Sequence, residues 1–161
     1  MGGKKNTIAK LDSMFSEHRY WHGNEPCHQI AYLFNYAGQP WKTQREVRHI
    51  METEYLNAPG GLSGNDDAGQ MSAWYVFSAM GFYPVCPGTP YYIIGSPSFP
   101  RMSICLENGK TFTILAHNAN EKNVYIQSAR LNGKEYDKNY FTHQDIVQGG
   151  TLEFQMGPNP N

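Results

Sequence analysis

Long apolar runs, an excess of charge of one sign and paired cysteines are all lacking in this sequence of 161 residues. No apolar run approaches the roughly 18 residues that a membrane-spanning helix needs. Thirteen basic and fourteen acidic residues give a net charge of −1, which provides no basic surface for nucleic acid or for an anionic membrane. We therefore expect neither nucleic acid nor a membrane among the partners.

Cysteine is scarce as well. Cys27, Cys86 and Cys105 are an odd number of residues, far apart in the chain and without a Cys-x-x-Cys pair. This spacing argues against a zinc cage and against a disulfide framework. A disulfide between Cys86 and Cys105 is one alternative, but we expect three buried thiols.

Aromatic residues are abundant by contrast. They make up 14% of the chain, with eleven tyrosines and three tryptophans, whereas charged residues make up only 17%. A free-standing surface usually carries more charge. The aromatic excess indicates surface that another part or partner covers, or rings that stack on sugars or bases.

The first half of the chain shows helical spacing. Apolar residues recur at helical intervals between residues 6 and 16, and further helices are predicted to begin at Pro26 and Pro40, because proline suits the first helical turn. A fourth helix is predicted over about residues 70–80, with Trp74 on its core-facing side. The pattern indicates antiparallel helices joined by loops.

The period of the pattern changes after residue 88. Short β-branched runs, separated by turn sequences, predict strands at residues 91–94, 102–106, 111–115, 123–127 and 151–156. Helices followed by strands predict an α+β fold. We expect a helical unit over residues 1–88 and an antiparallel, β-sandwich-like unit over residues 89–161.

Asp66 and Asp67 end a glycine-rich loop, Gly61–Gln70, that runs directly into the fourth predicted helix. Two carboxylates on such a loop can act as a general base or hold a metal ion. They can also cap the helix, because Asp67 and Gln70 have the spacing of a capping box. The two roles are compatible, since one aspartate can cap while the other faces a ligand.

Four motifs resemble, in the right order, the C-terminal part of glycoside hydrolase family 92. They are His-Gly-Asn-Glu-Pro at 22–26, Tyr-Ala-Gly-Gln-Pro-Trp at 36–41, Gly-Asn-Asp-Asp-Ala-Gly-Gln-Met-Ser at 64–72 and Gly-Phe-Tyr-Pro at 81–84. Members of this family are calcium-dependent, inverting exo-α-mannosidases, typified by bacterial α-1,2-mannosidases. The resemblance implies that the helices are part of an (α/α)6 barrel and that the partners are α-mannoside glycans such as mannan or N-glycans.

The resemblance also implies roles for single residues. It assigns Asp66 and Asp67 to catalysis, as the carboxylates that activate water. The other assignments fall in one loop: Asn24 and Glu25 as ligands of calcium, and His22, Glu25 and Trp21 as contacts of the sugar. For the intact enzyme a periplasmic or secreted location is implied, although no signal-peptide pattern precedes the first predicted helix.

No residue of the chain matches the general acid of the family. Inversion needs an acid and a base carboxyl about 6.5–9.5 Å apart with water between them, and two adjacent aspartates cannot form that pair. We therefore expect a C-terminal fragment that is inactive by itself. Self-association through faces that truncation exposes is a further expectation.

A function of another class is kept as the alternative, namely a non-catalytic carbohydrate-binding or structural module. Four tyrosines of the predicted β unit could stack on sugar in such a module: Tyr91, Tyr92, Tyr125 and Tyr140. Sugar contacts on the helical loops would indicate a catalytic part, and contacts on the sheet would indicate a binding module.

Overall fold

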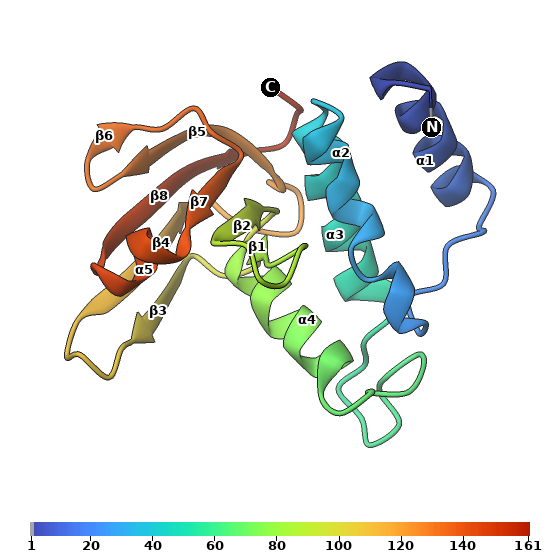
Figure 1. The fold of residues 1–161 in the computed structure, drawn as a ribbon, viewed down its shortest axis with the longest axis horizontal. Coiled ribbons are helices and arrows are strands. Elements are labelled where there is room, and N and C mark those ends of the chain that lie inside the picture. Colours follow the sequence, from blue (N-terminus) through green and yellow to red (C-terminus); the bar gives the residue numbers. More distant parts are fainter. Residues whose placement is uncertain (1) are drawn as a thin grey trace.

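The computed structural model describes residues 2–161. Apart from the short helix α5, which lies among the strands, helices gather on one side of the molecule and strands on the other, which confirms the α+β prediction (Figure 1). The helices are α1 (Lys4–Ser16), α2 (Leu33–Tyr36), α3 (Pro40–Thr53), α4 (Gln70–Met80) and α5 (His143–Val147), with 3-10 turns η1 (Glu25–Cys27) and η2 (Ile30–Tyr32). No helix in this described part has both the length and the apolar character that crossing a membrane requires.

The strands form two sheets. The small sheet has the order β1-β2-β7 and the larger one the order β3-β4-β8-β5-β6. The bounds are β1 Phe82–Tyr83, β2 Tyr91–Ile94, β3 Arg101–Cys105, β4 Thr111–His117, β5 Tyr125–Leu131, β6 Lys134–Glu135, β7 Tyr140–Thr142 and β8 Gly150–Gly157. Because β8 pairs with β4 in parallel, the larger sheet is mixed and not wholly antiparallel as expected.

Helix α4 lies between two left-handed glycines. Gly69 and Gly81 both have φ near +96°, a conformation that glycine adopts without steric cost. The space at Gly81 is also closed, because a Cβ there would lie 2.9 Å from Pro97. These two constraints make α4 begin and end where the sequence predicts.

The segment after Pro26 is not the continuous helix that we expected. It forms η1, η2 and the short helix α2, with Tyr32 donating its N–H to the carbonyl of Gln29, three residues back. The carbonyl of His28, which an α-helix would use instead, accepts the indole N–H of Trp74 at 2.8 Å. A long-range contact therefore replaces the local hydrogen bond.

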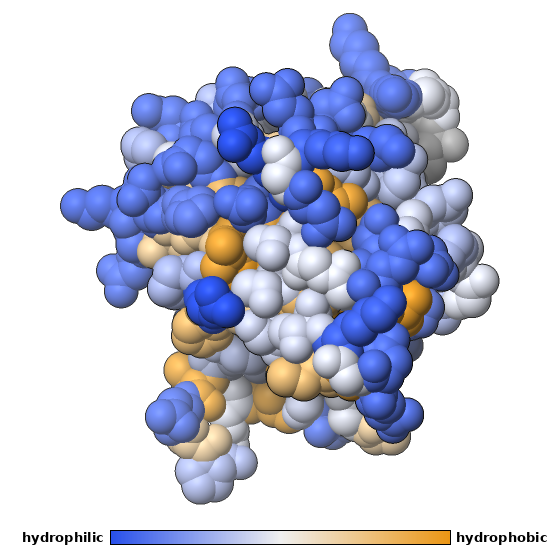
Figure 2. Space-filling view, turned by 90° about the vertical axis from the view of Figure 1, so that its left-hand side faces the viewer, coloured by the Kyte–Doolittle hydropathy of each residue, from blue (hydrophilic) through white to orange (hydrophobic). Residues whose placement is uncertain are grey.

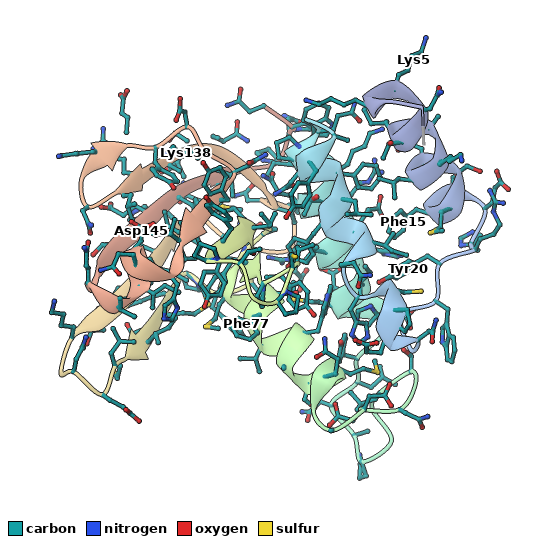
Figure 3. The ribbon with its side chains drawn as sticks, in the orientation of Figure 1. Lys5, Phe15, Tyr20, Phe77, Lys138 and Asp145 are labelled. Carbon is teal, nitrogen blue, oxygen red and sulfur yellow. The ribbon has the colours of Figure 1, made fainter. Side chains whose placement is uncertain are left out.

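Two buried clusters hold the fold together. One lies between the larger sheet, the small sheet and α5, and the other lies between η2, α3, α4 and the small sheet. Phe77 packs against both, and in Figure 3 its side chain extends from α4 toward the strands. The helical and β parts thus share a continuous apolar contact, and the expected domain boundary near residue 88 stays a prediction.

The cysteine prediction was wrong in one respect. All three thiols are free, but Cys86 and Cys105 are exposed and Cys27 is half-buried. Cys105 ends β3, a strand whose side chains alternate between solvent and the core, and it falls on the solvent side. The side of the molecule that carries the larger sheet is mostly hydrophilic, with apolar atoms visible only in patches (Figure 2).

Candidate functional site

The two loops that carry the predicted site residues touch through glycine backbones. A Cβ placed on Gly64 would lie 2.2 Å from the carbonyl oxygen of Gly23, and one on Gly23 would lie 2.8 Å from the carbonyl oxygen of Ser63. Only residues without a side chain permit so close an approach. The His-Gly-Asn-Glu loop is therefore held against the Asn-Asp-Asp loop, at the lower end of the helical part in Figure 1.

The adjacent aspartates have different surroundings. The carboxylate of Asp66 is half-buried and accepts the backbone N–H of Ser72 at 2.9 Å, in the first turn of α4. Asp67 is exposed, has φ of +48°, and makes no side-chain hydrogen bond or ion pair with any residue from 2 to 161. The capping box of Asp67 and Gln70 does not form, because Gly69 is the N-cap residue. Asp66 thus holds the helix end and leaves the Asp67 carboxylate free.

Asn24 and Glu25 lie on the facing loop, and both are exposed. The Asn24 amide nitrogen lies 3.8 Å from the sulfur of Cys27, and Glu25 is the first residue of η1. Burial lowers the pKa of His28, and this effect is opposed first by its hydrogen bond to the His22 carbonyl and then by the nearby carboxylates of Glu25 and Asp67. The two free carboxylates therefore lie around one buried imidazole.

His22 is fully buried beneath these loops, with 0% of its surface exposed. Its Nδ1 lies 2.7 Å from the hydroxyl of Tyr20, and its Nε2 lies 2.7 Å from the hydroxyl of Tyr55. The Tyr55 hydroxyl donates in turn to the carbonyl oxygen of Met71, at 3.0 Å. Burial and the neighbouring His28 ring lower the pKa of His22 to about 3, so the ring is neutral at physiological pH.

The direction of each bond in this chain follows from the last acceptor. Since a carbonyl oxygen only accepts, the Tyr55 hydroxyl gives its proton to Met71 and accepts from Nε2–H of His22. Nδ1 of His22 is then unprotonated and accepts from Tyr20. The Tyr20 hydroxyl also lies 3.4 Å from the carbonyl oxygen of Cys27, so these buried polar groups together tie the first loop to the start of α4.

His28 adds a second connection between the same elements. Its Nε2 donates to the carbonyl of His22 at 3.0 Å, and its Nδ1 lies 3.4 Å from the amide nitrogen of Gln70. The Gln70 amide also donates to the hydroxyl of Tyr83 at 2.7 Å. Trp74 is 0% exposed, which confirms its predicted position in the core, and its indole N–H donates to the His28 carbonyl.

Of the predicted sugar contacts, Trp21 is the one with an exposed aromatic face. It is 56% exposed, and its ring lies over Gly23, where a Cβ would come within 2.6 Å of a ring carbon. The structure therefore brings Asp67, Asn24, Glu25 and Trp21 to one surface and places His22 beneath it. The residues that sequence reasoning missed are the supporting ones, Tyr20, Tyr55, His28, Gln70 and Tyr83.

Calcium prefers six to eight oxygen ligands. Asn24, Glu25 and Asp67 carry oxygens of the right kind, but no group of three or more His, Cys, Asp or Glu side chains within residues 2–161 is placed to hold a metal ion. These residues therefore fit calcium in chemical type, and they are fewer than a complete shell requires.

Comparison with known proteins places the chain in a family. The sequence profile of the glycosyl hydrolase family 92 catalytic domain matches residues 1–158. The family GH92 α-mannosidase BT3965 from Bacteroides thetaiotaomicron superposes with a TM-score of 0.94 and 46% identity over 99% of this chain. The complex of BT3965 with mannoimidazole superposes with a TM-score of 0.85 and 51% identity, over 88% of this chain and 19% of that one.

Two further relatives agree. The family GH92 inverting mannosidase BT2199 from Bacteroides thetaiotaomicron VPI-5482 superposes with a TM-score of 0.93 and 43% identity over the whole chain. An uncharacterized secreted glycosidase of Arthroderma benhamiae is 38% identical over 160 residues, or 98% of this chain. The chain spans 21% of that relative, 22% of BT3965 and 25% of BT2199. It belongs to glycosyl hydrolase family 92.

Proposed function

We propose that this chain forms the base-and-metal side of the active site of a calcium-dependent, inverting exo-α-mannosidase. The substrates are terminal α-mannosides of mannan or N-glycans, α-1,2-linked ones in particular. One observation carries the proposal: the Gly23–Gly64 contact holds a free carboxylate, Asp67, against a second loop that presents Asn24 and Glu25.

Asp67 is the general base in this proposal. Its carboxylate has no partner within residues 2–161 and can accept the proton of a water molecule that attacks the anomeric carbon. Asp66 is engaged by the Ser72 N–H and holds the loop in place. The acid must then be a separate carboxyl, about 6.5–9.5 Å from the base, which none of the proposed site residues provides.

Asn24 and Glu25 would hold calcium through the amide oxygen and the carboxylate. When bound, the ion would hold the 2- and 3-hydroxyls of a mannose ring, since hydroxyl oxygens suit its preference for hard ligands. Trp21 would form a wall of the sugar pocket. His22, expected to contact sugar, is proposed to position the two loops instead, because no part of its side chain reaches the surface.

Three relatives support this proposal. BT3965 is an α-mannosidase with a structure in complex with mannoimidazole, and BT2199 is described as inverting. The Arthroderma benhamiae relative is described as secreted, and we propose a secreted or periplasmic location for the protein that contains this chain.

A segment exchange tests the proposal. The part of BT3965 that superposes on this chain is replaced by the 161 residues, and hydrolysis of an α-1,2-mannobiose is followed by NMR of the anomeric protons. We expect release of β-mannose as the first product, and loss of turnover with a calcium chelator. The unmodified chain alone should show no turnover, because it carries no matching acid.

Single variants in the exchanged protein assign the roles. Asp67→Asn should remove turnover and keep substrate binding, whereas Glu25→Gln should raise the calcium concentration needed for activity. Glu107→Gln, an exposed carboxylate in a turn of the larger sheet, is the control and should change neither. A folded exchange protein that keeps its turnover with Asp67→Asn would refute the base assignment.

A further inference from the structure

An aromatic hollow lies between the helical part and the small sheet, away from the candidate site. It has a volume of about 350 Å³ and is lined by Asn35, Tyr36, Tyr91, Ile93, Asn139 and Tyr140. This volume falls within the range of about 300–1,000 Å³ that small-molecule sites occupy. In Figure 3, Lys138, which precedes β7, lies in the upper half of the molecule, whereas the loop before α4 lies at the lower end.

Strand alternation explains which tyrosines meet there. Tyr91 and Ile93 lie on one face of β2, and the pairing of Ile93 with Tyr140 brings β7 alongside. The rings of Tyr91 and Tyr140 meet edge to face, with centroids 5.2 Å apart. Tyr36 joins them from the end of α2.

The other tyrosines considered for sugar stacking do not take part. Tyr92 lies on the opposite face of β2, where it packs against Phe82 and Phe141 and bonds His143 through its hydroxyl. Tyr125 lies on β5 and is not part of the lining. Of the four tyrosines considered for sugar stacking, only Tyr91 and Tyr140 line the hollow, and Tyr36 from the helical part is the third tyrosine there.

Two of the three tyrosines of the hollow have exposed rings, and all three have hydroxyls without a partner among the described residues. Tyr36 is 54% exposed and Tyr91 is 47% exposed, although large aromatic rings are usually covered. Their hydroxyls and that of Tyr140 bond to no residue from 2 to 161, which is also true of Tyr75 and Tyr125, whereas the hydroxyls of Tyr83, Tyr92 and Tyr136 bond within the chain. Three aromatic faces and three free hydroxyls thus surround one space.

Asn35 provides a polar group in the same lining. It is 5% exposed and donates through Nδ2 to the carbonyl of Ile94 at 2.7 Å, and Asn139 donates back to the Asn35 carbonyl at 3.3 Å. The side-chain oxygen of Asn35 is buried without any donor among the described residues. A buried acceptor left without a partner is rare, and it suits a ligand hydroxyl or a bridging water.

The chemistry of this lining fits a neutral sugar. All six lining side chains are uncharged, and the one charged group beside them is the ammonium of Lys138, 5.7 Å from the centroid of the Tyr140 ring. The negative face of an aromatic ring attracts the weakly positive C–H groups on one side of a pyranose ring. Amide and phenol groups at the edges can pair with the ring's hydroxyls.

We propose that this hollow is a second, non-catalytic site that binds one pyranose ring of a neutral glycan. The site goes beyond the proposed hydrolysis, and only the choice of a mannoside as the first probe rests on that proposal. Binding here would hold a branched or repeating glycan on the protein while another of its ends is processed elsewhere.

The test uses the 161-residue chain and methyl α-mannopyranoside, with the methyl glucoside and galactoside as further neutral probes. Residue-resolved NMR should show saturable shifts at Asn35, Tyr36, Tyr91 and Tyr140 with at least one of the three. Tyr91→Ala should weaken binding about tenfold through loss of a stacking face. Tyr91→Phe, which keeps the ring and the strand, should lose less affinity.

Two controls separate the hollow from the candidate active site. Tyr125→Ala removes a tyrosine outside the hollow, and Asp67→Asn alters the proposed catalytic base; neither should change the shifts at Tyr91. If the segment exchange with BT3965 fails to give an enzyme, this binding result is unaffected. Absence of saturable shifts with all three probes would overturn the inference.

Two other results would also overturn it. Shifts confined to the loops around Glu25 and Asp67 would mean that sugar binds only at the candidate site. Self-association of the chain that Tyr91→Ala abolishes, measured by sedimentation without sugar, would mean that the hollow is a contact between copies of the protein.

Discussion

Nε2 of His22 lies 2.7 Å from the hydroxyl of Tyr55, although 33 positions separate the two residues in the chain. The bond joins the loop that carries the proposed calcium ligands to the segment that leads into the loop of Asp66 and Asp67, the proposed catalytic residues. Because the hydroxyl passes its own proton to Met71, a single phenol serves two buried polar groups. The candidate site thus depends on a hydrogen bond between residues far apart in the chain, which no local sequence pattern predicts.

Tyr55→Phe should therefore destabilise the chain. The change leaves Nε2–H of His22 without its partner, and an unsatisfied buried group costs about 1–3 kcal/mol. Urea unfolding should show the loss. Tyr75→Phe on α4 is the matched control, because the Tyr75 hydroxyl makes no hydrogen bond within residues 2–161. Equal stability of the two variants would contradict the hydrogen-bond chain.

The glycine contact between the loops gives a second prediction. Gly64→Ala places a methyl group 2.2 Å from the Gly23 carbonyl, so one loop must move. Overpacking of this kind costs about 1–3 kcal/mol, and we expect a lower unfolding midpoint in urea. Gly60→Ala is the control, since a Cβ there has nothing within 4 Å. A Gly64→Ala variant as stable as Gly60→Ala would show that the loops are not held together here.

Stability should fall as pH falls. The pKa of His22 is lowered to about 3 in the folded chain, whereas an unfolded histidine has a pKa of about 6.5. Between these values the unfolded chain binds a proton that the folded chain does not. Stability is therefore complete above about pH 6.5 and is lost on acidification by up to about 1.4 kcal/mol per pH unit from this group. The pKa of His28 is also lowered, which acts in the same direction.

Urea unfolding at about pH 7 and about pH 5, in metal-free buffer, measures this dependence. His22→Gln should be less stable at both values but less sensitive to pH. His49→Gln, on the exposed face of α3, should keep the pH dependence of the parent chain. An unchanged slope in His22→Gln would mean that other groups bind the protons.

Local chemistry was enough to predict some elements. Gly69 and Gly81 bound α4 because left-handed residues end a helix wherever they occur. Asn132 and Gly133, both with positive φ, form the turn between β5 and β6, and an Asn-Gly pair is a strong local signal for such a turn. The sequence analysis did not predict the short helix α5, although Thr142 and Asp145 have the spacing of a capping box and form one at its start.

Other features depend on contacts between distant residues. The helix expected after Pro26 is broken because Trp74 takes the His28 carbonyl, and nothing near His28 in the sequence indicates that bond. The same limit applies to His22. Its position beside Asn24 suggests a surface role, but its burial depends on Tyr20 and Tyr55, whose approach the sequence alone does not reveal.

The different surroundings of Asp66 and Asp67 allow their roles to be separated by experiment. Asp66→Ala removes the acceptor of the Ser72 N–H, and loss of such a cap costs about 0.5–2 kcal/mol of stability. Asp67→Asn removes only an exposed charge and keeps a residue that tolerates positive φ, so its stability should stay within about 0.5 kcal/mol of the parent. Urea unfolding of the 161-residue chain measures both.

These stabilities, measured together with turnover in the exchanged BT3965 protein, distinguish a residue that holds the loop in place from one that takes part in the reaction. If Asp67 is the base and Asp66 only caps the helix, Asp67→Asn should be fully stable and have no turnover. Asp66→Ala should then be less stable and keep some turnover. If the two variants lose turnover equally while only Asp66→Ala is destabilised, both carboxylates take part in activating water. Destabilisation by Asp67→Asn would instead show that its carboxylate is engaged in the folded chain, against the free position described here.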